Sequence, residues 1–287
     1  MIEVMASNAS INEPALWLAQ FPWPRPEHHK YDRGHAVILG GAPGHTGAAK
    51  LAALSALRSG AGLVSVVCNA ENFLIYASAF QAVMTPRLKN EKEYKRFIQD
   101  TRVRSLLLGP GAGQSARTKS YVLSALTAAK PIVLDADALT VFADMPKKLF
   151  KAIRSPCILT PHEGEFRRLF PAISHASNDK ILWARKAATE SGAVILLKGH
   201  NTLIAAPGER TAVNQNATPF LATAGSGDCL AGICTGLLAQ GMPAFEAAAA
   251  AVWLHSRAAE TFGPGLISDD IPSLMPRALT EIYQLSQ

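Results

Sequence analysis

Charged and aromatic side chains are scarce in this sequence, and their scarcity argues against nucleic acid as a partner. Only 17% of the 287 residues are charged and 7% are aromatic, whereas 48% are hydrophobic. Lys and Arg outnumber Asp and Glu by 28 to 22, which gives a net charge of +6, but these residues are scattered along the chain. Because nucleic-acid binding requires a basic stripe with stacking aromatics, we expect a small anionic molecule as the partner instead.

Cysteines and long apolar runs are also few. Cys68, Cys157, Cys229 and Cys234 occur singly, without CxxC pairs or the Cys/His spacing of a zinc site. They predict reduced core cysteines in a cytoplasmic protein. Neither the first 18 residues nor the Ala-rich run over residues 245–252 has the length and apolarity of a signal peptide or membrane span, so we expect no membrane association.

What the sequence does contain is a regular alternation of short apolar runs with helical stretches. The runs are apolar on both faces, which is typical of an α/β fold with a mostly parallel sheet covered by helices. Residues 1–33 are predicted as a leader with one helix around 14–20 and a Pro-rich connector, and residues 34–287 as one domain. The predicted strands are 35–39, 63–68, 105–108, 131–134, 157–160, 193–197 and 202–206, and the predicted helices are 46–59, 116–129, 229–238, 244–262 and 270–285.

Glycine and polar residues recur where the predicted strands end. Ligands of open α/β sheets bind at the carboxyl ends of the strands, so we expect these loops to converge on one site. The loops are residues 40–47, 109–113, 135–137, 161–165, 198–201 and 224–228.

The loop Gly225-Ser226-Gly227 followed by Asp228 carries the strongest chemical signal. It precedes an apolar helical run, so its backbone N–H groups lie at a helix N-terminus, which favours negative charge. Such a site suits a phosphate or a transition state that resembles one. A first-turn acid stabilises a helix by only about 0.3–1 kcal/mol, and this does not require glycine on both sides of Ser226.

Other polar residues admit two interpretations. The two earlier glycine loops are as typical of tight turns as of binding loops. Asp135 and Asp137 follow a strand and could hold magnesium through water, although for Asp137 capping of a short helix over 138–142 is the preferred interpretation. For His162, substrate contact is placed slightly ahead of a hydrogen-bonding role. Lys198 requires a nearby anion, and we favour phosphate over an acidic side chain.

Three further histidines are assigned no function. His255 lies within the Ala-rich helical stretch and is expected to be structural, and His28 and His29, in the Pro-rich connector, are expected to be exposed.

The motifs together resemble a known family. Residues 223–228 (Thr-Ala-Gly-Ser-Gly-Asp) are similar to the Gly-x-Gly-Asp motif of the ribokinase-like superfamily. Six further segments resemble ADP-dependent NAD(P)H-hydrate dehydratases and occur in family order. They are the glycine pattern of residues 40–49, residues 56–64, Leu-Gly-Pro-Gly at 108–111, Leu-Asp-Ala-Asp-Ala-Leu at 134–139, Leu-Thr-Pro-His-Glu-Gly-Glu at 159–165 and Leu-Lys-Gly at 197–199. Cys229 departs from the usual aliphatic residue without changing its small apolar character. The resemblance implies a three-layer ribokinase-like fold, without the epimerase domain of bifunctional members.

The resemblance also implies an activity. The family dehydrates the hydrates of NADH and NADPH, in which water has added to the nicotinamide ring, by phosphorylating the hydroxyl with ADP and then expelling phosphate to leave AMP. It implies Mg²⁺, a homotetramer and Asp228 as general base. The anion hole would be Gly225, Ser226 and Gly227; the hydrate would contact Ala48, Gly111, His162 and Asp228; the adenine nucleotide would contact Lys198, Gly199, His200, Asn201, Thr202 and Gly227.

Two alternatives stay open at this point. A hydroxyethylthiazole or hydroxymethylpyrimidine kinase of the same superfamily would also use Asp228, but would make a stable phosphate ester. A nucleotide-binding sensor would tolerate loss of the Asp228 charge. The motif at residues 161–165 and the first glycine loop favour the dehydratase.

Overall fold

The protein is built on one nine-stranded sheet. The computed structural model describes residues 9–287, and the strand order is β1-β9-β8-β7-β6-β5-β4-β2-β3. All neighbouring strands are parallel except β7–β8 and β8–β9, which confirms the prediction of a mostly parallel sheet. The strands are β1 (Ser10–Ile11), β2 (His35–Leu39), β3 (Leu63–Val67), β4 (Val103–Leu108), β5 (Ile132–Leu134), β6 (Cys157–Leu159), β7 (Val194–Leu197), β8 (Thr202–Ala205) and β9 (Thr211–Asn214).

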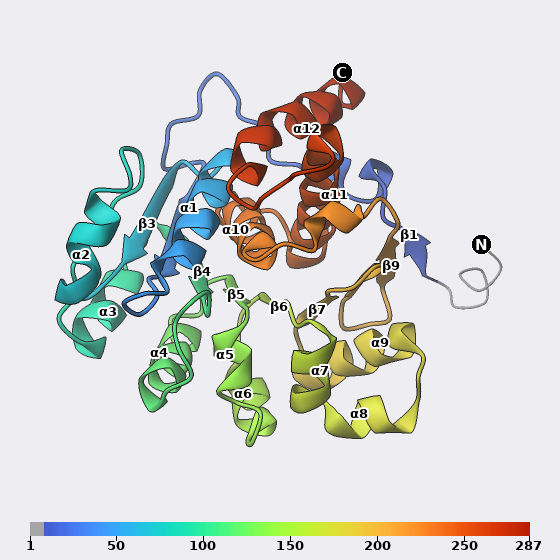
Figure 1. Cartoon of the computed structure of the whole chain (residues 1–287), viewed down its shortest axis with the longest axis horizontal. Coiled ribbons are helices and arrows are strands. Elements are labelled where there is room, and N and C mark those ends of the chain that lie inside the picture. Colours follow the sequence, from blue (N-terminus) through green and yellow to red (C-terminus); the bar gives the residue numbers. More distant parts are fainter. Residues whose placement is uncertain (1–8) are drawn as a thin grey trace.

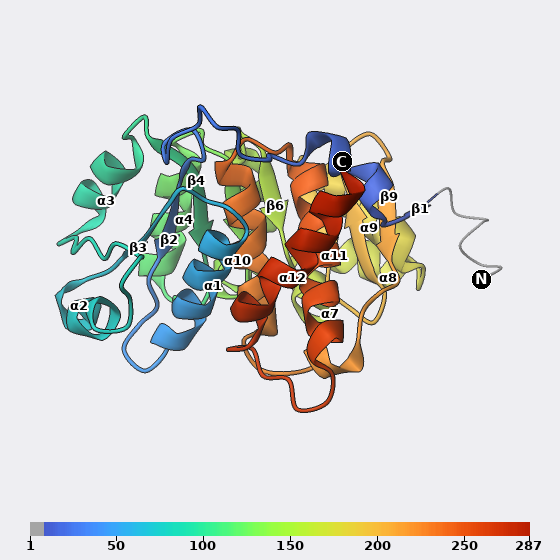
Figure 2. The same ribbon diagram turned by 90° about the horizontal axis from the view of Figure 1, so that it is seen from above.

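Helices cover both faces of the sheet, so the molecule has three layers and two hydrophobic cores (Figures 1 and 2). The first core lies beneath α1 (Thr46–Arg58), α10 (Ser226–Ala239), α11 (Ala244–Phe262) and α12 (Ile271–Leu285). The second lies beneath α3 (Glu91–Ile98), α4 (Ala116–Leu126), α5 (Asp137–Thr140), α6 (Pro146–Ala152), α7 (Glu163–Leu169), α8 (Pro171–Ala176) and α9 (Lys180–Ser191).

Helix α10 is pressed against α1 because its sequence has no side chain at two contact positions. A Cβ atom at Gly232 would lie 2.2 Å from the carbonyl oxygen of Ala52, and one at Gly236 would lie 2.5 Å from that of Ala56. The two helices therefore meet backbone to backbone, and this close packing fixes where α10 begins.

The segment before residue 34 departs from the sequence-based expectation. In place of one helix it forms two short 3₁₀ helices, Pro14–Leu16 and Leu18–Gln20. They hold Trp17 in the first core, where its exposed fraction is 1% and its ring packs against Trp253 of α11. Strand β1, also from this segment, pairs with β9. Residues 9–33 thus contribute to the same sheet and core, and the division at residue 34 stays a prediction.

Most of the other expected elements are confirmed with ends shifted by a few residues, and several were missed. The missed elements are β1, β9 and the helices α2 (Ala70–Ala77), α6, α8 and α9. The four cysteines are buried and unpaired, as expected, and His28 and His29 are exposed. Within residues 9–287, the helices all fall short of the length and apolarity that crossing a membrane requires.

Candidate functional site

The candidate site is organised around the N-terminus of α10. Gly225 precedes the helix with a left-handed backbone (φ +90°), where a Cβ atom would lie 2.5 Å from the Leu51 side chain. The N–H of Ser226 donates to the carbonyl of Thr223 over 3.3 Å. The N–H groups of Gly227 and Asp228 have no hydrogen-bond partner within residues 9–287. The helix start therefore presents two unpaired donors, at Gly227 and Asp228, whereas the N–H of Ser226, predicted as part of the anion hole, is paired; anion binding here stays a prediction.

A buried histidine fixes the first residue of this helix. His255 of α11 is 5% exposed, and its Nε2 lies 3.2 Å from the Ser226 hydroxyl. Burial lowers the pKa of His255 to about 4, so the ring is neutral near pH 7 and adds no charge to the site. This agrees with the structural role expected for His255.

Lys198 at the end of β7 points toward the same helix start. Its ammonium donates to Asp135 over 2.8 Å, and a Cβ atom at Gly227 would lie 3.2 Å from Nζ. Burial alone lowers the pKa of Lys198, but the carboxylates around it, Asp135 first, leave that pKa above its ordinary value. Asp135 is an acidic partner of Lys198, the anion that the sequence analysis ranked second, and contact with a phosphate stays a prediction. Lys198 is therefore a fixed cation beside the α10 N-terminus.

Asp228 is a carboxyl group with an unusual proton affinity. Burial raises its pKa, the charge of Asp135 raises it further, and Lys198 offsets part of the rise, which places the pKa at about 7 against an ordinary 3.8. A carboxyl group with this pKa can take and release a proton near neutral pH. Perturbation by burial together with specific charged partners is typical of active sites.

Asp135 itself is almost completely buried and is held from two sides. Its Oδ1 accepts from the Thr160 hydroxyl at 2.7 Å as well as from Lys198. Asp135 comes from the end of β5, Thr160 from the end of β6 and Lys198 from the end of β7, so neighbouring strands deliver the three groups to one point. The sequence identified the loops, but not this contact.

A groove runs from the α10 N-terminus along the end of β7. It brings together most of the residues assigned to the nucleotide, except the exposed Asn201. The half-buried Gly111 and Ala48, assigned to the hydrate, are also not part of its wall. The hydroxyl of Thr202 bonds to the Gly199 carbonyl over 3.1 Å and stabilises the turn. The lining includes His162, Lys198, Gly199, His200, Thr202, Ser226 and Gly227, together with Thr218, Thr223 and His255, which were not predicted as binding residues.

His162 has a structural role that the sequence analysis ranked second. It is the N-cap of α7, and its Nδ1 accepts from the N–H of Gly164 at 2.9 Å while the Glu165 carboxylate accepts from the His162 N–H at 2.9 Å. This reciprocal capping fixes the ring at the groove. Contact with a substrate stays a prediction.

The interpretation of Asp137 as a helix cap is wrong. The N-cap of α5 is Ala136, in an unusual backbone conformation (φ +48°), and no side chain caps that helix. The Asp137 carboxylate instead accepts from the N–H of Gly113 at 2.8 Å. Asp137 therefore connects the second glycine loop to the end of β5, near enough to Asp228 to raise its pKa.

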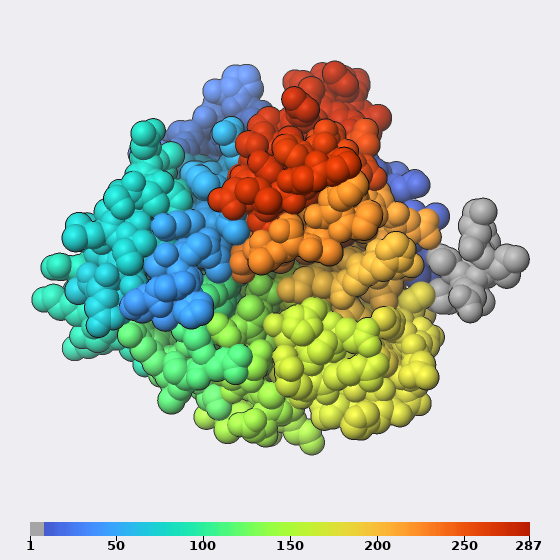
Figure 3. All heavy atoms as spheres, in the orientation of Figure 1, coloured from blue at the N-terminus to red at the C-terminus, as the bar shows by residue number. Residues whose placement is uncertain are grey.

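The two remaining predicted substrate residues lie where α1 and the second glycine loop begin. Ala48 is in the first turn of α1, three residues before Leu51, which contacts Gly225. Gly111 (φ +64°) accepts from the N–H of Ala42 at 2.9 Å, which ties the second glycine loop to the first. In the space-filling view the blue region that contains the first glycine loop and the orange region that contains the segment before α10 lie on the same face, with green segments next to them (Figure 3).

Comparison with known proteins places this arrangement in context. The model of the NAD(P)H-hydrate dehydratase family matches residues 36–274. The bifunctional NAD(P)H-hydrate repair enzyme of Salinibacter ruber is 37% identical over 91% of this chain and 51% of its own length. The ADP-dependent (S)-NAD(P)H-hydrate dehydratase of Neisseria meningitidis is 38% identical over 82% of this chain and 79% of its own length. The chain spans about half the length of the bifunctional relatives it matches.

Solved structures agree with the sequence comparison. The ADP/ATP-dependent NAD(P)H-hydrate dehydratase from Bacillus subtilis, co-crystallised with ATP/Mg²⁺, superposes with a TM-score of 0.83 at 28% identity, over 96% of this chain and 99% of that one. This similarity, together with the sheet covered by helices on both faces, confirms the ribokinase-like fold that the motifs implied.

Proposed function

Because the chain belongs to the NAD(P)H-hydrate dehydratase family, we propose that it repairs nicotinamide nucleotides by ADP-dependent dehydration of the hydrates of NADH and NADPH. The reaction would release AMP and phosphate and restore the ring double bond. The observation that supports the proposal is the carboxyl group of Asp228, which has a pKa of about 7 and lies at a helix start with two unpaired backbone donors.

Asp228 would act as the general base. A hydroxyl on the reduced nicotinamide ring is a poor leaving group, so it must first become a phosphate ester. Asp228 would take the hydroxyl proton as the oxygen attacks the terminal phosphorus of ADP. The C–O bond to the phosphate would then break, the electrons of a neighbouring C–H bond would form the double bond, and the proton released from that carbon would pass to water.

The α10 N-terminus and Lys198 would stabilise the transferring phosphoryl group. The N–H groups of Gly227 and Asp228 point from the positive end of the helix, and Lys198 adds a full positive charge beside them. Removal of one such donor in an enzyme typically costs about 2.7–4 kcal/mol of transition-state stabilisation. The groove along the end of β7 would hold the adenine nucleotide, with His200, Asn201 and Thr202 at its turn.

The acids of this site fit a magnesium ion that is held mainly by phosphates. Within residues 9–287 no group of three or more metal-ligating side chains occurs, and one or two carboxylates with water and phosphate oxygens are the usual environment of Mg²⁺. Asp137, with one oxygen on the Gly113 N–H, would hold the ion through water. When bound, Mg²⁺ would neutralise charge on the phosphates. A cytoplasmic location, which suits four unpaired cysteines, and a homotetramer belong to the same proposal.

One assay tests the function. Purified protein, ADP and Mg²⁺ are added to NADH hydrate, and recovery of dihydronicotinamide absorbance is followed together with AMP and phosphate. We expect the three products in equal amounts, and Asp228→Asn to reduce the rate at least about a hundredfold, because general base catalysis contributes about 10²–10⁴-fold. Asp144→Asn, an exposed acid outside the site, is the matched control.

The products also separate the dehydratase from a kinase. A kinase would consume nucleotide and leave a stable phosphorylated hydrate, without recovery of absorbance. That result, or full activity of Asp228→Asn, would contradict the proposed function.

A further inference from the structure

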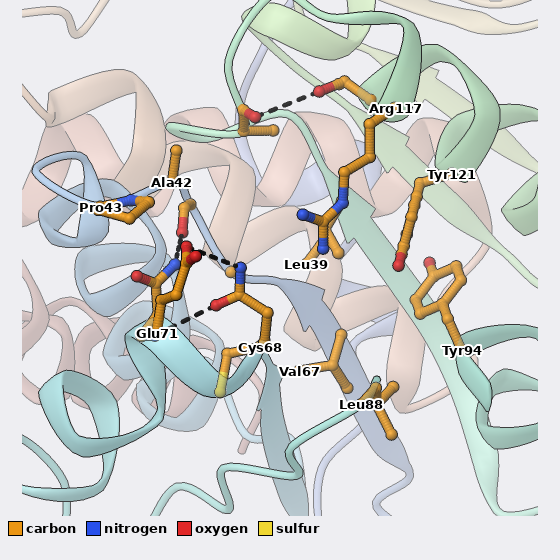
Figure 4. A pocket seen from close by; sticks show the side chains of 16 residues that line it. Leu39, Ala42, Pro43, Val67, Cys68, Glu71, Leu88, Tyr94, Arg117 and Tyr121 are labelled. Atoms are coloured by element: carbon orange, nitrogen blue, oxygen red, sulfur yellow. Dashed lines mark hydrogen bonds between the residues drawn. The ribbon is translucent and has the colours of Figure 1, made fainter. Parts of the chain in front are cut away.

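A second cavity lies beside the first glycine loop (Figure 4). It shares no lining residue with the groove at β7. It opens between the ends of β2 and β3 and the helices α2, α3 and α4. Leu39, Val67 and Leu88 form apolar walls, and Tyr94 and Tyr121 stand together at one side, with their ring centroids 4.9 Å apart. The cavity holds about 130 Å³, close to the roughly 150 Å³ of an apolar cavity that binds benzene. Its size and walls suit a planar ring.

One buried polar atom in the wall of this cavity lacks a partner. Asn72 is 3% exposed, and its Nδ2 donates to the Gly41 carbonyl over 2.6 Å. That bond fixes the orientation of the Asn72 amide, since only its NH₂ end can donate to the Gly41 carbonyl. The Oδ1 of Asn72 has no hydrogen-bond partner within residues 9–287. A buried acceptor left unpaired costs about 1–3 kcal/mol, but this oxygen is shielded from the cavity, so it does not select the ligand.

Charges of both signs lie at the mouth of the cavity, with Arg117 and Lys89 against Glu71 and Glu91. Arg117 reaches from α4 into the space between Tyr121 on one side and Ala42 and Glu71 on the other (Figure 4). Its guanidinium lies 5.4 Å from the Tyr121 ring centroid, and it takes part in none of the ion pairs of the described chain. The surface hollow outside the mouth adds the exposed Lys89. Glu71, at the same mouth, is hydrogen-bonded by Asn69 over 3.5 Å. An anionic group is the natural partner of Arg117.

The cavity adjoins the catalytic side of the molecule through one loop. Ala112 lines it, and the chain neighbours of Ala112 are Gly111, a predicted hydrate contact, and Gly113, which Asp137 binds. Ala42, which also lines the cavity, donates to the Gly111 carbonyl. One loop therefore borders both the predicted hydrate contact Gly111 and the cavity.

We infer that this cavity receives the adenine ring of the dinucleotide hydrate beside Tyr94 and Tyr121, with Arg117 bound to the phosphate of its adenylate half. This inference rests on the proposed function. It makes the cavity a specificity subsite, which binds the half of the substrate that does not react. The co-substrate nucleotide uses the separate groove at β7.

The test compares two hydrates that differ only in this half. One is NADH hydrate, and the other is the hydrate of reduced nicotinamide mononucleotide, which has no adenylate. At saturating ADP, we expect Arg117→Ala to raise the KM for NADH hydrate at least about tenfold, since a hydrogen bond to a charged group contributes about 1.5–3 kcal/mol. The kcat and the KM for the mononucleotide hydrate should not change. Lys119→Ala is the control, because that cation on the same helix faces Met145 and Phe142.

Two results would overturn the inference. One is an unchanged KM for NADH hydrate in Arg117→Ala, and the other is an equal rise for both hydrates, which would place Arg117 on the shared nicotinamide half. Calorimetric titration of ADP-ribose in the presence of saturating ADP provides a readout without turnover. We expect Arg117→Ala to raise its Kd at least about tenfold and Lys119→Ala to leave it unchanged. If neither hydrate reacts but this difference is found, the proposed function fails and the subsite stands; equal Kd values refute the subsite alone.

Discussion

The charge of Asp135 helps to determine the pH at which Asp228 can accept a proton, and the substitution Asp135→Asn isolates this effect. In the wild-type protein the pKa of Asp228 is about 7. The carboxylate fraction is therefore about 9% at pH 6 and about 91% at pH 8, and kcat/KM for the hydrate should rise about tenfold between them. A carboxyl group at its ordinary 3.8 would give a flat profile over this range.

In Asp135→Asn the midpoint should move below pH 7. Burial is the largest cause of the raised pKa of Asp228, and the negative charge of Asp135 is the second. The substitution removes that charge and leaves the positive charge of Lys198, so both changes favour the Asp228 carboxylate. The asparagine carbonyl can still accept from the Thr160 hydroxyl, whose present bond is 2.7 Å, so the site should keep its geometry.

The assay is the initial rate of absorbance recovery at saturating ADP, measured at several pH values with low hydrate concentration. Asp144→Asn should keep the wild-type midpoint, and reactions without enzyme correct for spontaneous hydration of the product. A flat wild-type profile between pH 6 and 8 would refute the assignment of Asp228 as a base with a raised pKa. A midpoint near 7 that persists in Asp135→Asn would refute the role of the Asp135 charge.

Three further predictions concern stability. The pKa of Asp228 in the folded protein lies above its unfolded value of 3.8, so the protein loses stability as the pH rises from about 4 to about 7. Asp228→Asn should therefore raise the unfolding free energy by at most about 4 kcal/mol above pH 7 and hardly at all at pH 4. Urea denaturation at the two pH values would measure this difference. Lys198→Met should lower the unfolding free energy by about 3–5 kcal/mol, because it leaves the buried Asp135 unpaired, and adding Asp135→Asn should recover part of the loss in the same denaturation assay. Gly232→Ala should cost about 1–3 kcal/mol, seen as a lower Tm in calorimetry, since its Cβ would press on the backbone of α1; an unchanged Tm would contradict that packing.

The parts of the fold that could be predicted are those in which apolar runs end at glycine or polar loops. The strand ends that carry Asp135 and Lys198 were visible because burial on both faces of a parallel sheet gives unbroken apolar runs. The α10 N-terminus, which does not follow a strand, was visible from its glycine loop and the apolar run after it. Helix α9 was missed although Asp179 caps its start and Gly192 ends it with a left-handed backbone. Those signals were present, but the helix is only weakly amphipathic and its charged residues obscure the pattern.

The contacts between distant segments could not be predicted from the sequence. The Asp135–Lys198 pair joins residues 63 positions apart, and the Ser226–His255 contact joins two helices. The role of Asp137 was mistaken because a carboxylate at a strand end can cap the next helix or bind another loop equally well. Only the register of β4 and β5 brings Gly113 within its reach.

Both edges of the sheet are closed by small pieces of chain, and this limits how copies of the protein can associate. Strand β1 covers the edge of β9 with only two residues, and Asn12 continues the pairing through a bond to Val213. At the opposite edge, the segment 84–87 pairs with β3 through the bridges Ser65–Met84 and Cys68–Arg87. Short or covered edges discourage the strand-to-strand aggregation that open edges invite. Any homotetramer should therefore form through helical faces and loops and should leave the nine-stranded sheet unextended.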